Sequence, residues 1–227
     1  MRINEIFSSI EGEGVNQGLP TTFVRTQGCP WRCTWCDSEH TWDTWGGSER
    51  SIEQIIEKVK KITTHGNIVS ITGGDPMLQK LEVEELSKQL INEGFLVNLE
   101  HTGLFGASIR HELDFLHKLD FVSFDIKPPS SGISLDKIKE GITHIMNYRY
   151  TFSIKCVVMC PEDLEFLKEA VFPFKDPRTV LTLMPCNSKD HYDEPLLIIN
   201  DIVEFLKTTR CRNVKLGSQL HKTYGLK

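Results

Sequence analysis

Residues 28–36 read GCPWRCTWC and place three of the seven cysteines of the chain, Cys29, Cys33 and Cys36, within eight positions. In a reducing compartment, cysteines this close together indicate a metal site rather than disulfides. Thiolates are the usual ligands of iron–sulfur clusters, which commonly take four protein ligands. Three cysteines therefore leave one iron open to a small molecule that carries an amine and a carboxylate. The alternative is a zinc site, because His40 completes the spacing C-x3-C-x2-C-x3-H.

The chain beyond the cysteines alternates between short apolar runs and amphipathic stretches. The apolar runs are rich in Val, Ile, Phe and Thr and predict buried strands at residues 21–26, 68–72, 96–100, 121–125, 152–158, 179–184 and 213–216. The amphipathic stretches predict helices at residues 51–64, 82–93, 109–117, 135–146, 162–171 and 194–208. The first of these helices begins with a capping box, in which Ser51 is followed by Gln54.

About six repeats of strand and helix predict an α/β fold with a parallel sheet. A complete eight-fold barrel typically needs about 250 residues, and the chain has 227. We therefore expect a partial, open parallel β/α barrel of about six βα units, in a single domain that covers residues 1–227. A flat doubly wound sheet is the alternative. In both folds the functional site lies at the carboxyl ends of the strands.

The composition is that of an ordinary globular protein, with 39% hydrophobic and 25% charged residues. The net charge of −5 disfavours a protein that coats nucleic acid or an anionic membrane. No apolar run approaches the roughly 20 residues of a membrane helix. The first residues lack the apolar core of a signal peptide. These features favour a cytoplasmic protein without a nucleic-acid or membrane partner.

Glycines and polar residues follow several of the predicted strands. Glycines at the end of a strand let a ligand approach the backbone closely. Side chains at the ends of successive parallel strands meet in a shared site. The candidates are Thr72, Gly73, Gly74, Asp75, Glu100, Asp125, Lys127, Pro185 and Asn187.

The cysteine spacing and the glycine pair resemble those of the radical S-adenosylmethionine (SAM) superfamily. The resemblance implies a [4Fe–4S] cluster on the three cysteines, with SAM on the open iron as the source of a 5′-deoxyadenosyl radical. It places Trp35 beside the adenine of SAM. The further contacts to SAM would come from Gly73, Gly74, Asp75, Glu100, Asp125, Lys127, Pro185 and Asn187. The superfamily motif usually has glutamate where this chain has Asp75.

Further segments resemble those of the 7-carboxy-7-deazaguanine synthases, a family of ring-contracting radical SAM enzymes in 7-deazapurine (queuosine) biosynthesis. They are residues 6–14 (IFSSIEGEG), 23–26 (FVRT), 36–38 (CDS), 127–131 (KPPSS) and 218–227 (SQLHKTYGLK). The resemblance implies a lyase that converts 6-carboxy-5,6,7,8-tetrahydropterin to 7-carboxy-7-deazaguanine with release of ammonia. The implied task of the side chains is binding and positioning, and none is expected to be catalytic.

The same resemblance implies a substrate site that the tail, about residues 217–227, closes by folding over it. Its members would be Ile10, Glu11, Gly12, Glu13, Arg25, Thr72, His221 and the terminal carboxylate of Lys227. Carboxylates accept hydrogen bonds from the guanine-like edge of a pterin, and an arginine clamps a carboxylate with two parallel bonds. The hydroxyl of Ser38 would bind Mg²⁺ together with water and substrate oxygens. A flavodoxin or ferredoxin would supply electrons, and we expect a homodimer.

Two other functions stay open. A radical SAM activase that generates glycyl radicals on a partner protein shares the cysteines and the glycine pair, but it would not need residues 10–14 or the tail. A zinc-binding interaction module would need only the cysteines and His40. Metal analysis separates the zinc module from both radical enzymes.

Overall fold

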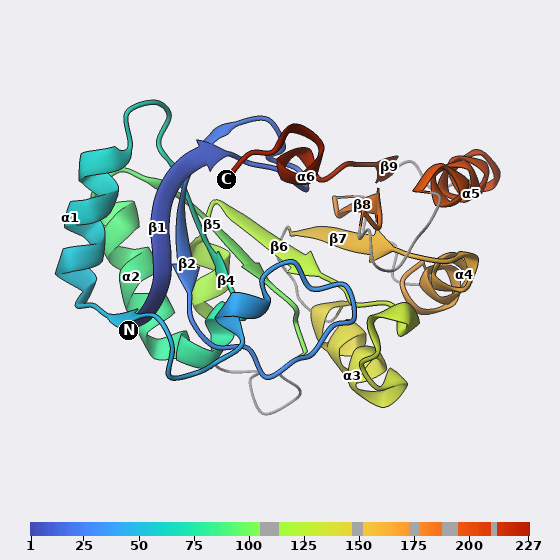
Figure 1. Ribbon diagram of the computed structural model, residues 1–227, viewed down its shortest axis with the longest axis horizontal. Coiled ribbons are helices and arrows are strands. Elements are labelled where there is room, and N and C mark those ends of the chain that lie inside the picture. The colour runs from blue at the N-terminus through green and yellow to red at the C-terminus, as the bar shows by residue number, and fades with distance from the viewer. Residues whose placement is uncertain (105–113, 147–151, 173–177, 188–194, 210–212) are drawn as a thin grey trace.

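The computed structural model describes residues 1–104, 114–146, 152–172, 178–187, 195–209 and 213–227. In this part of the chain one sheet has the strand order β3-β1-β2-β4-β5-β6-β7-β8-β9 (Figure 1). The strands are β1 (Arg2–Ile10), β2 (Pro20–Thr26), β3 (Ser48–Glu49), β4 (Ile68–Gly73), β5 (Leu96–His101), β6 (Phe121–Asp125), β7 (Ser153–Val158), β8 (Val180–Pro185) and β9 (Val214–Leu216).

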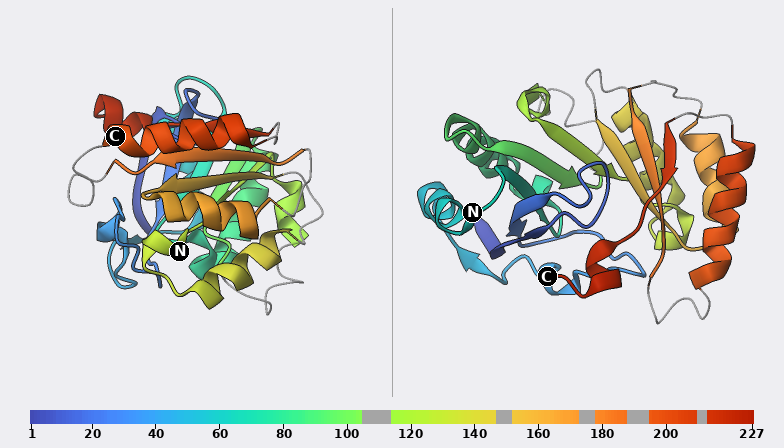
Figure 2. Two further views of the ribbon diagram at one scale, coloured as in Figure 1. Left: turned by 90° about the vertical axis from the view of Figure 1, so that its right-hand side faces the viewer. Right: turned by 90° about the horizontal axis from the view of Figure 1, so that it is seen from above.

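The strands β2 and β4 to β9 run parallel to one another and follow in chain order. Because this order never reverses, the described sheet lacks the switch point of a doubly wound fold, and that alternative is wrong. β3 and β9 lie at opposite edges of the sheet. Figure 2 shows the strands curving around an interior, with the long helices on the outside. The prediction of an open, partial parallel barrel is confirmed.

The longer helices match the predicted ones closely. They are α1 (Ile52–Ile62), α2 (Lys80–Asn92), α3 (Leu135–Met146), α4 (Pro161–Ala170) and α5 (Pro195–Thr208). The capping box of α1 is formed, since Ser51 Oγ accepts from the Gln54 amide at 3.2 Å and Gln54 Oε1 accepts from the Ser51 amide at 3.0 Å. Of the helix expected at residues 109–117, the first five residues lie outside the described part of the chain. The rest belongs to a short 3-10 helix, Asp114–Lys118.

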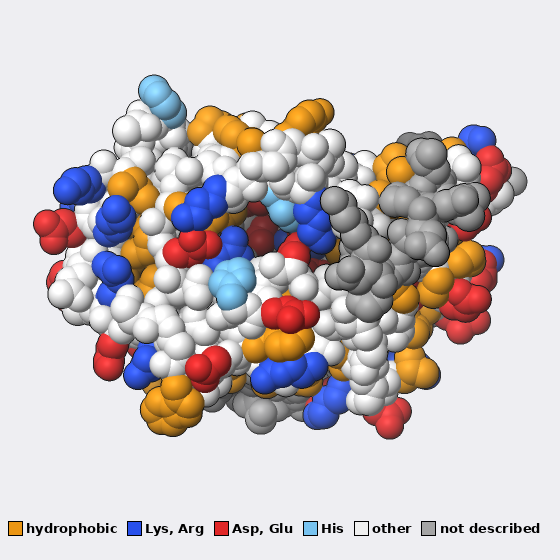
Figure 3. All heavy atoms as spheres, viewed as in Figure 1, with side chains coloured by type: hydrophobic (Ala, Val, Ile, Leu, Met, Phe, Trp, Pro, Cys, Tyr) orange, Lys and Arg blue, Asp and Glu red, His pale blue; other side chains and the backbone are white. Residues whose placement is uncertain are grey.

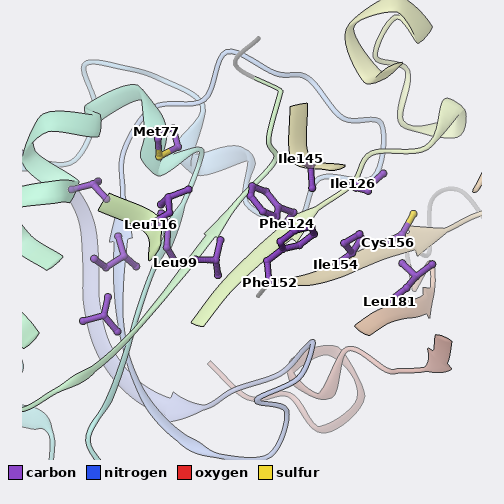
Figure 4. Close-up of a cluster of buried hydrophobic side chains, with 14 of the residues drawn as sticks. Met77, Leu99, Leu116, Phe124, Ile126, Ile145, Phe152, Ile154, Cys156 and Leu181 are labelled. Carbon is purple, nitrogen blue, oxygen red and sulfur yellow. The ribbon is translucent and has the colours of Figure 1, made fainter. Parts of the chain in front are cut away.

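The apolar core lies between the sheet and the helices (Figure 4). Side chains alternate along β7, as they do in any strand. Ile154 and Cys156 pack into this core, whereas Lys155 lines the interior of the barrel. The rings of Phe124 and Phe152 meet edge to face with centroids 5.2 Å apart. The burial of such side chains contributes about 25 cal/mol per Å², so the outer layer stabilises the barrel and leaves its interior for polar groups.

Among the described strands and α-helices, those that were not predicted are β1, β3 and the short helix α6 (Leu220–Tyr224). β1 pairs antiparallel with β2, and its register joins Ile3 to Thr26 and Ile10 to Pro20. Its sequence, RINEIFSSI, mixes polar and apolar residues on both faces and gives a weak strand pattern. The hairpin that it forms with β2 brings residues 11–13 to the barrel interior. Among the described helices, none combines the length and hydropathy needed to span a bilayer.

Candidate active site

A cavity of about 320 Å³ lies within the barrel. Figure 3 shows the corresponding hollow, surrounded by acidic, basic and histidine side chains. Most of the site residues expected from the sequence line the cavity: Ile10, Glu11, Gly12, Glu13, Arg25, Cys29, Cys33, Trp35, Cys36, Ser38, Thr72, Gly73, Gly74, Glu100, Asp125, Lys127, His221 and Lys227. The structure does not bring Asp75, Pro185 or Asn187 to its lining. A larger groove of about 1310 Å³ between α3, α4 and α5 has none of the three cysteines in its lining.

The cysteine loop runs from the end of β2 across the mouth of the cavity. Cys29 and Cys33 are buried, Cys36 is half-buried, and all three thiols are free. Burial raises the pKa of each of these thiols, in the case of Cys29 to about 11. Without a metal the three groups are therefore neutral thiols at pH 7. Metal binding would have to displace three protons, so the affinity of the site for metal should increase with pH.

The geometry of the loop bears on which metal it fits. Among the described residues, no three His, Cys, Asp or Glu side chains converge on a position where a single ion could bind. In a [4Fe–4S] cluster each cysteine binds a different iron, so Cys29, Cys33 and Cys36 fit a cluster without such convergence.

The glycine pair at the end of β4 packs directly against the cysteine loop. A Cβ atom placed on Gly74 would lie 2.9 Å from the Cβ of Cys29 and would overlap the carbonyl oxygen of Gly28. Gly73 has a φ of +139°, and a Cβ there would meet the backbone of Thr26. Only glycine allows the strand end and the loop to come this close.

The side chain of Asp75, the residue after the glycines, is turned away from the cavity and is 1% exposed. Its Oδ2 accepts a hydrogen bond from the Thr102 hydroxyl at 2.6 Å, and its Oδ1 accepts from the Met77 amide at 3.1 Å. Burial raises the pKa of Asp75 to about 6. Its carboxylate holds the turn after β4, so a contact to SAM at this position would have to come from the backbone.

A buried ion-pair network crosses the interior of the barrel. Lys155 Nζ lies 2.7 Å from Glu13 Oε2 and 3.1 Å from Glu100 Oε2, and the lysine side chain is 6% exposed. The Gln219 side-chain amide donates to Glu13 Oε1 at 2.8 Å. Burial lowers the pKa of Lys155, but the charges of Glu100 and Glu13 outweigh this effect and hold the pKa well above its usual value. Glu13 is correspondingly kept ionised, with a lowered pKa.

Glu11 provides the neutral counterpart to Glu13. It is 4% exposed, and its Oε2 atom is buried without a hydrogen-bond partner. Burial, reinforced by the charge of Glu100, raises the pKa of Glu11 to about 8. At pH 7 the cavity therefore holds a carboxylic acid that donates, next to a carboxylate that accepts. This pair matches a planar ligand edge that carries both a carbonyl oxygen and N–H groups.

Arg25 also lines the cavity and supplies positive charge there. Its Nε donates to Glu5 Oε1 at 3.0 Å and its Nη1 donates to Ser38 Oγ at 3.3 Å. The guanidinium carbon lies 5.5 Å from the centre of the Phe7 ring. Ser38 in turn donates to Asp37 Oδ1 at 3.1 Å. The Ser38 hydroxyl faces the cavity, but its role as a ligand of Mg²⁺ stays a prediction.

The tail residues 217–227 lie across one side of the cavity, where Figure 1 shows α6 beside the β1–β2 hairpin. The Leu220 amide donates to the Gly12 carbonyl at 3.1 Å. Asp37 Oδ2 lies 3.4 Å from His221 Nε2 and 3.2 Å from Lys222 Nζ. Burial would raise the pKa of Asp37, but the hydrogen bond from His221 and the charge of Lys222 hold it well below its usual range. The tail thereby joins the hairpin to the cysteine loop.

Lys155, Asp37, Gln219 and Lys222 line the cavity but were not among the expected site residues. Lys155 left a signal in the sequence, because it is the one charged residue in the apolar strand 152–158, where an ionised side chain requires a partner. Asp37 follows Cys36 directly. Gln219 and Lys222 carry no comparable signal, since their place depends on how the tail folds back.

Comparisons with known proteins support the assignment of this cavity to a radical SAM enzyme. Residues 23–171 match the model of the radical SAM superfamily. The 7-carboxy-7-deazaguanine synthase of Methanospirillum hungatei is 34% identical over 226 residues, which cover 100% of this chain and 86% of that protein. The protein of the same name from Pyrobaculum aerophilum is 34% identical over 203 residues, covering 88% and 86%. The crystal structure of QueE from Escherichia coli has a TM-score of 0.66 at 25% identity and covers 96% of this chain and 93% of that chain.

The open barrel, the cysteine loop and the superfamily match define the protein as a radical SAM enzyme. Its cofactors are accordingly a [4Fe–4S] cluster and SAM, and it acts on a small molecule with the help of a reductant. Three free thiols beside a glycine-lined cavity fit these cofactors. Within the superfamily, the chain belongs to the family of the 7-carboxy-7-deazaguanine synthases.

Proposed function

We propose that the protein is a lyase that converts 6-carboxy-5,6,7,8-tetrahydropterin to 7-carboxy-7-deazaguanine and ammonia. The observation that carries this proposal is that Glu11, Glu13 and Arg25 line one cavity, with a raised pKa at Glu11 and a lowered pKa at Glu13. A pterin has a guanine-like edge with one carbonyl and several N–H groups, and this substrate also bears a carboxylate. A neutral acid, an ionised acid and an arginine are the complementary groups.

The cluster ligands in this proposal are Cys29, Cys33 and Cys36, and the backbone of Gly73 and Gly74 lies where SAM would approach. When bound, the cluster and SAM supply the radical that removes a hydrogen atom from the substrate. The protein's own residues bind and orient. Glu11 donates to the carbonyl of the ring, Glu13 accepts from its N–H groups, and the tail excludes water from the cavity.

Lys155 has a positioning role in this scheme. Its ammonium pairs with both Glu13 and Glu100 and so offsets part of the negative charge inside the barrel. Its raised pKa makes it a poor proton donor.

Several finer assignments belong to the same proposal. Ser38 would bind Mg²⁺ beside the substrate carboxylate, and contacts to SAM would come from Trp35, Glu100, Asp125 and Lys127. Thr72, Ile10, Gly12 and His221 line the substrate side of the cavity. A flavodoxin or ferredoxin would supply the electron, and the protein would act as a homodimer. The described cysteines are free, which supports a reducing compartment such as the cytoplasm.

A glycyl-radical activase is the second candidate, because it would use the same cysteines. Such an enzyme must admit a polypeptide segment of its partner to the radical. The tail lies across this cavity through Leu220 and His221, and the volume of about 320 Å³ suits a small molecule. These two features favour the pterin.

The test is to reconstitute the protein with iron and sulfide without oxygen and to add SAM, reductant, Mg²⁺ and the pterin. We expect 5′-deoxyadenosine and a product lighter by one ammonia, both detected by mass spectrometry. The Cys36→Ala variant should give neither, and Glu13→Gln should form the cluster but bind the pterin poorly. Turnover of SAM with the pterin left intact would contradict the proposed substrate. Bound zinc without sulfide would contradict the cluster.

A further inference from the structure

The segment after β6, residues 128–132, has no role in the proposed reaction, yet it is fixed by a buried carboxylate. Asp163 lies in the first turn of α4 and is 0% exposed. Its Oδ1 accepts from the Ser130 amide at 3.1 Å, and its Oδ2 accepts from the Ser130 hydroxyl in a short hydrogen bond. The Met159 amide also donates to Oδ2, at 2.9 Å. A buried carboxyl group with this many donors is held in a single orientation.

The other side of the same segment holds the cysteine loop. The Thr34 amide donates to the Ser131 carbonyl at 3.1 Å, and the Thr34 hydroxyl donates to the Ser130 carbonyl at 2.9 Å. A Cβ atom on Gly132 would lie 3.0 Å from the methyl group of Thr34, so the Thr34 side chain packs closely on the backbone of Gly132. Thr34 stands between Cys33 and Cys36. The chain of contacts therefore runs from Asp163 through Ser130 to two of the three cysteines.

We propose that Asp163 is a positioning residue for the iron–sulfur cluster, which acts by holding Ser130 and, through it, Thr34 and the cysteine loop. The proposal rests on the assignment of Cys29, Cys33 and Cys36 as cluster ligands. A cluster binds firmly only where its ligands are held at the required separation, and groups beyond the ligands commonly supply that support. The loop itself is long and irregular, so its shape depends on such external contacts.

A purely local role for Asp163 is the alternative. Its side chain also accepts a hydrogen bond from the Cys160 amide at 3.4 Å, and thus caps the N-terminus of α4. A helix cap would affect the stability of α4 but would leave the cysteine loop unchanged. Variants at the far end of the contact chain separate the two roles, because the Thr34 amide and hydroxyl donate to Ser131 and Ser130 and not to α4.

The experiment compares Asp163→Asn, Thr34→Val and Thr34→Ser with a matched control, Glu162→Gln. The control changes an acidic residue in the same helical turn, but Glu162 is exposed, and the Ser130 amide and hydroxyl bond to Asp163 instead. In the apoprotein, hydrogen exchange of the peptide that contains Thr34 reports on the loop without any cluster. In the reconstituted protein, the rate of iron release to a chelator and the electron paramagnetic resonance spectrum of the reduced cluster report on the ligands.

We expect Asp163→Asn and Thr34→Val to accelerate both exchange and iron release by about tenfold or more, and to alter the spectrum. Thr34→Ser keeps the hydroxyl and should behave like the wild type, as should Glu162→Gln. The proposal is overturned if Asp163→Asn leaves exchange and iron release unchanged, or if Thr34→Val has no effect. If Asp163→Asn does not fold, Thr34→Val and Ser130→Ala decide alone. Wild-type protein that holds a cluster but ignores the pterin would refute the proposed function and leave this inference intact.

Discussion

Lys155 and Glu13, which are 142 positions apart in the sequence, form an ion pair of 2.7 Å inside the barrel. The same ammonium also lies 3.1 Å from Glu100 Oε2. Its removal would leave two buried carboxylates without a cation, and breaking a buried pair in this way costs about 3–5 kcal/mol. We expect Lys155→Met to lower the free energy of unfolding by about that amount in urea titrations. It should also weaken binding of the pterin.

The control for this variant is Lys207→Met. Lys207 pairs with Glu204 at 2.6 Å on the surface of α5, and its side chain is 64% exposed. An exposed pair of this kind contributes less than about 1 kcal/mol. Equal losses of unfolding free energy in the two variants would show that the interior pair contributes no more to stability than an exposed one.

The protonation state of Glu11 makes stability depend on pH. Its pKa of about 8 in the folded protein lies above the ordinary value of 4.5, so the native state keeps a proton that the unfolded state releases. This contribution is fully present below pH 4.5 and is lost as the pH rises through 8. It amounts to at most about 5 kcal/mol, at roughly 1.36 kcal/mol per pKa unit.

Glu11→Gln removes this titration while keeping a similar shape. We expect the wild type to be more stable relative to Glu11→Gln at pH 5 than at pH 9, in urea titrations of the apoprotein. Other titrating groups are common to both proteins and cancel in the difference. A difference that stays constant between these pH values would mean that Glu11 is ionised throughout.

The close contact between Gly74 and the cysteine loop predicts a steric effect. In Gly74→Ala the new methyl group would collide with Gly28 and Cys29, so the loop has to move. We expect the iron and sulfide content after reconstitution to fall, and the dissociation constant of SAM to rise by about tenfold or more, the equivalent of roughly 1.4 kcal/mol.

Gly94→Ala is the matched control. Gly94 ends α2 with a φ of +86°, and a Cβ there would meet no atom within 4 Å. The substitution costs about 1 kcal/mol of backbone strain but should leave the cluster unchanged. Normal cluster content in Gly74→Ala would contradict the idea that the glycine is needed at this contact.

The contacts of Asp37 predict how firmly the tail holds the substrate. Asp37→Asn weakens the interactions with His221 and Lys222. The Asp37 side chain is 43% exposed, so solvent screens the pairs and their loss costs about 1 kcal/mol. We expect the KM for the pterin to rise by roughly fivefold with little change in kcat. Asp43→Asn, an exposed change in the same loop, should leave both constants as they are.

The sequence predicted the outer layers of the barrel better than its interior. The helix α1 shows why, because its capping box and the buried Ile55, Ile56 and Val59 are local features that repeat every three or four residues. β1 was not predicted because its apolar residues do not alternate cleanly with polar ones. Local sequence patterns are enough to predict an element such as α1. The pattern of β1 is weak, and its strand conformation depends instead on its pairing with β2.

For the site, the family resemblance named most residues that line the cavity but did not show where their side chains point. Asp75 follows the glycine pair as expected, and yet its carboxylate points to Thr102. The orientation of one side chain depends on partners that are distant in the sequence. The same holds for Lys155, whose partners Glu13 and Glu100 belong to other strands and loops.

The pairs that close the cavity are among the most distant in the chain. Gln219 and Glu13 are 206 positions apart, and His221 and Asp37 are 184 apart. Contacts at such separations form late in folding, because a long loop must close before they bring any stabilisation. The three cysteines, by contrast, lie within eight positions of one another. A chain that has not finished folding therefore presents thiols to metal and oxidants before it has a cavity to shield them, so late docking of the tail is also the step that protects the cluster.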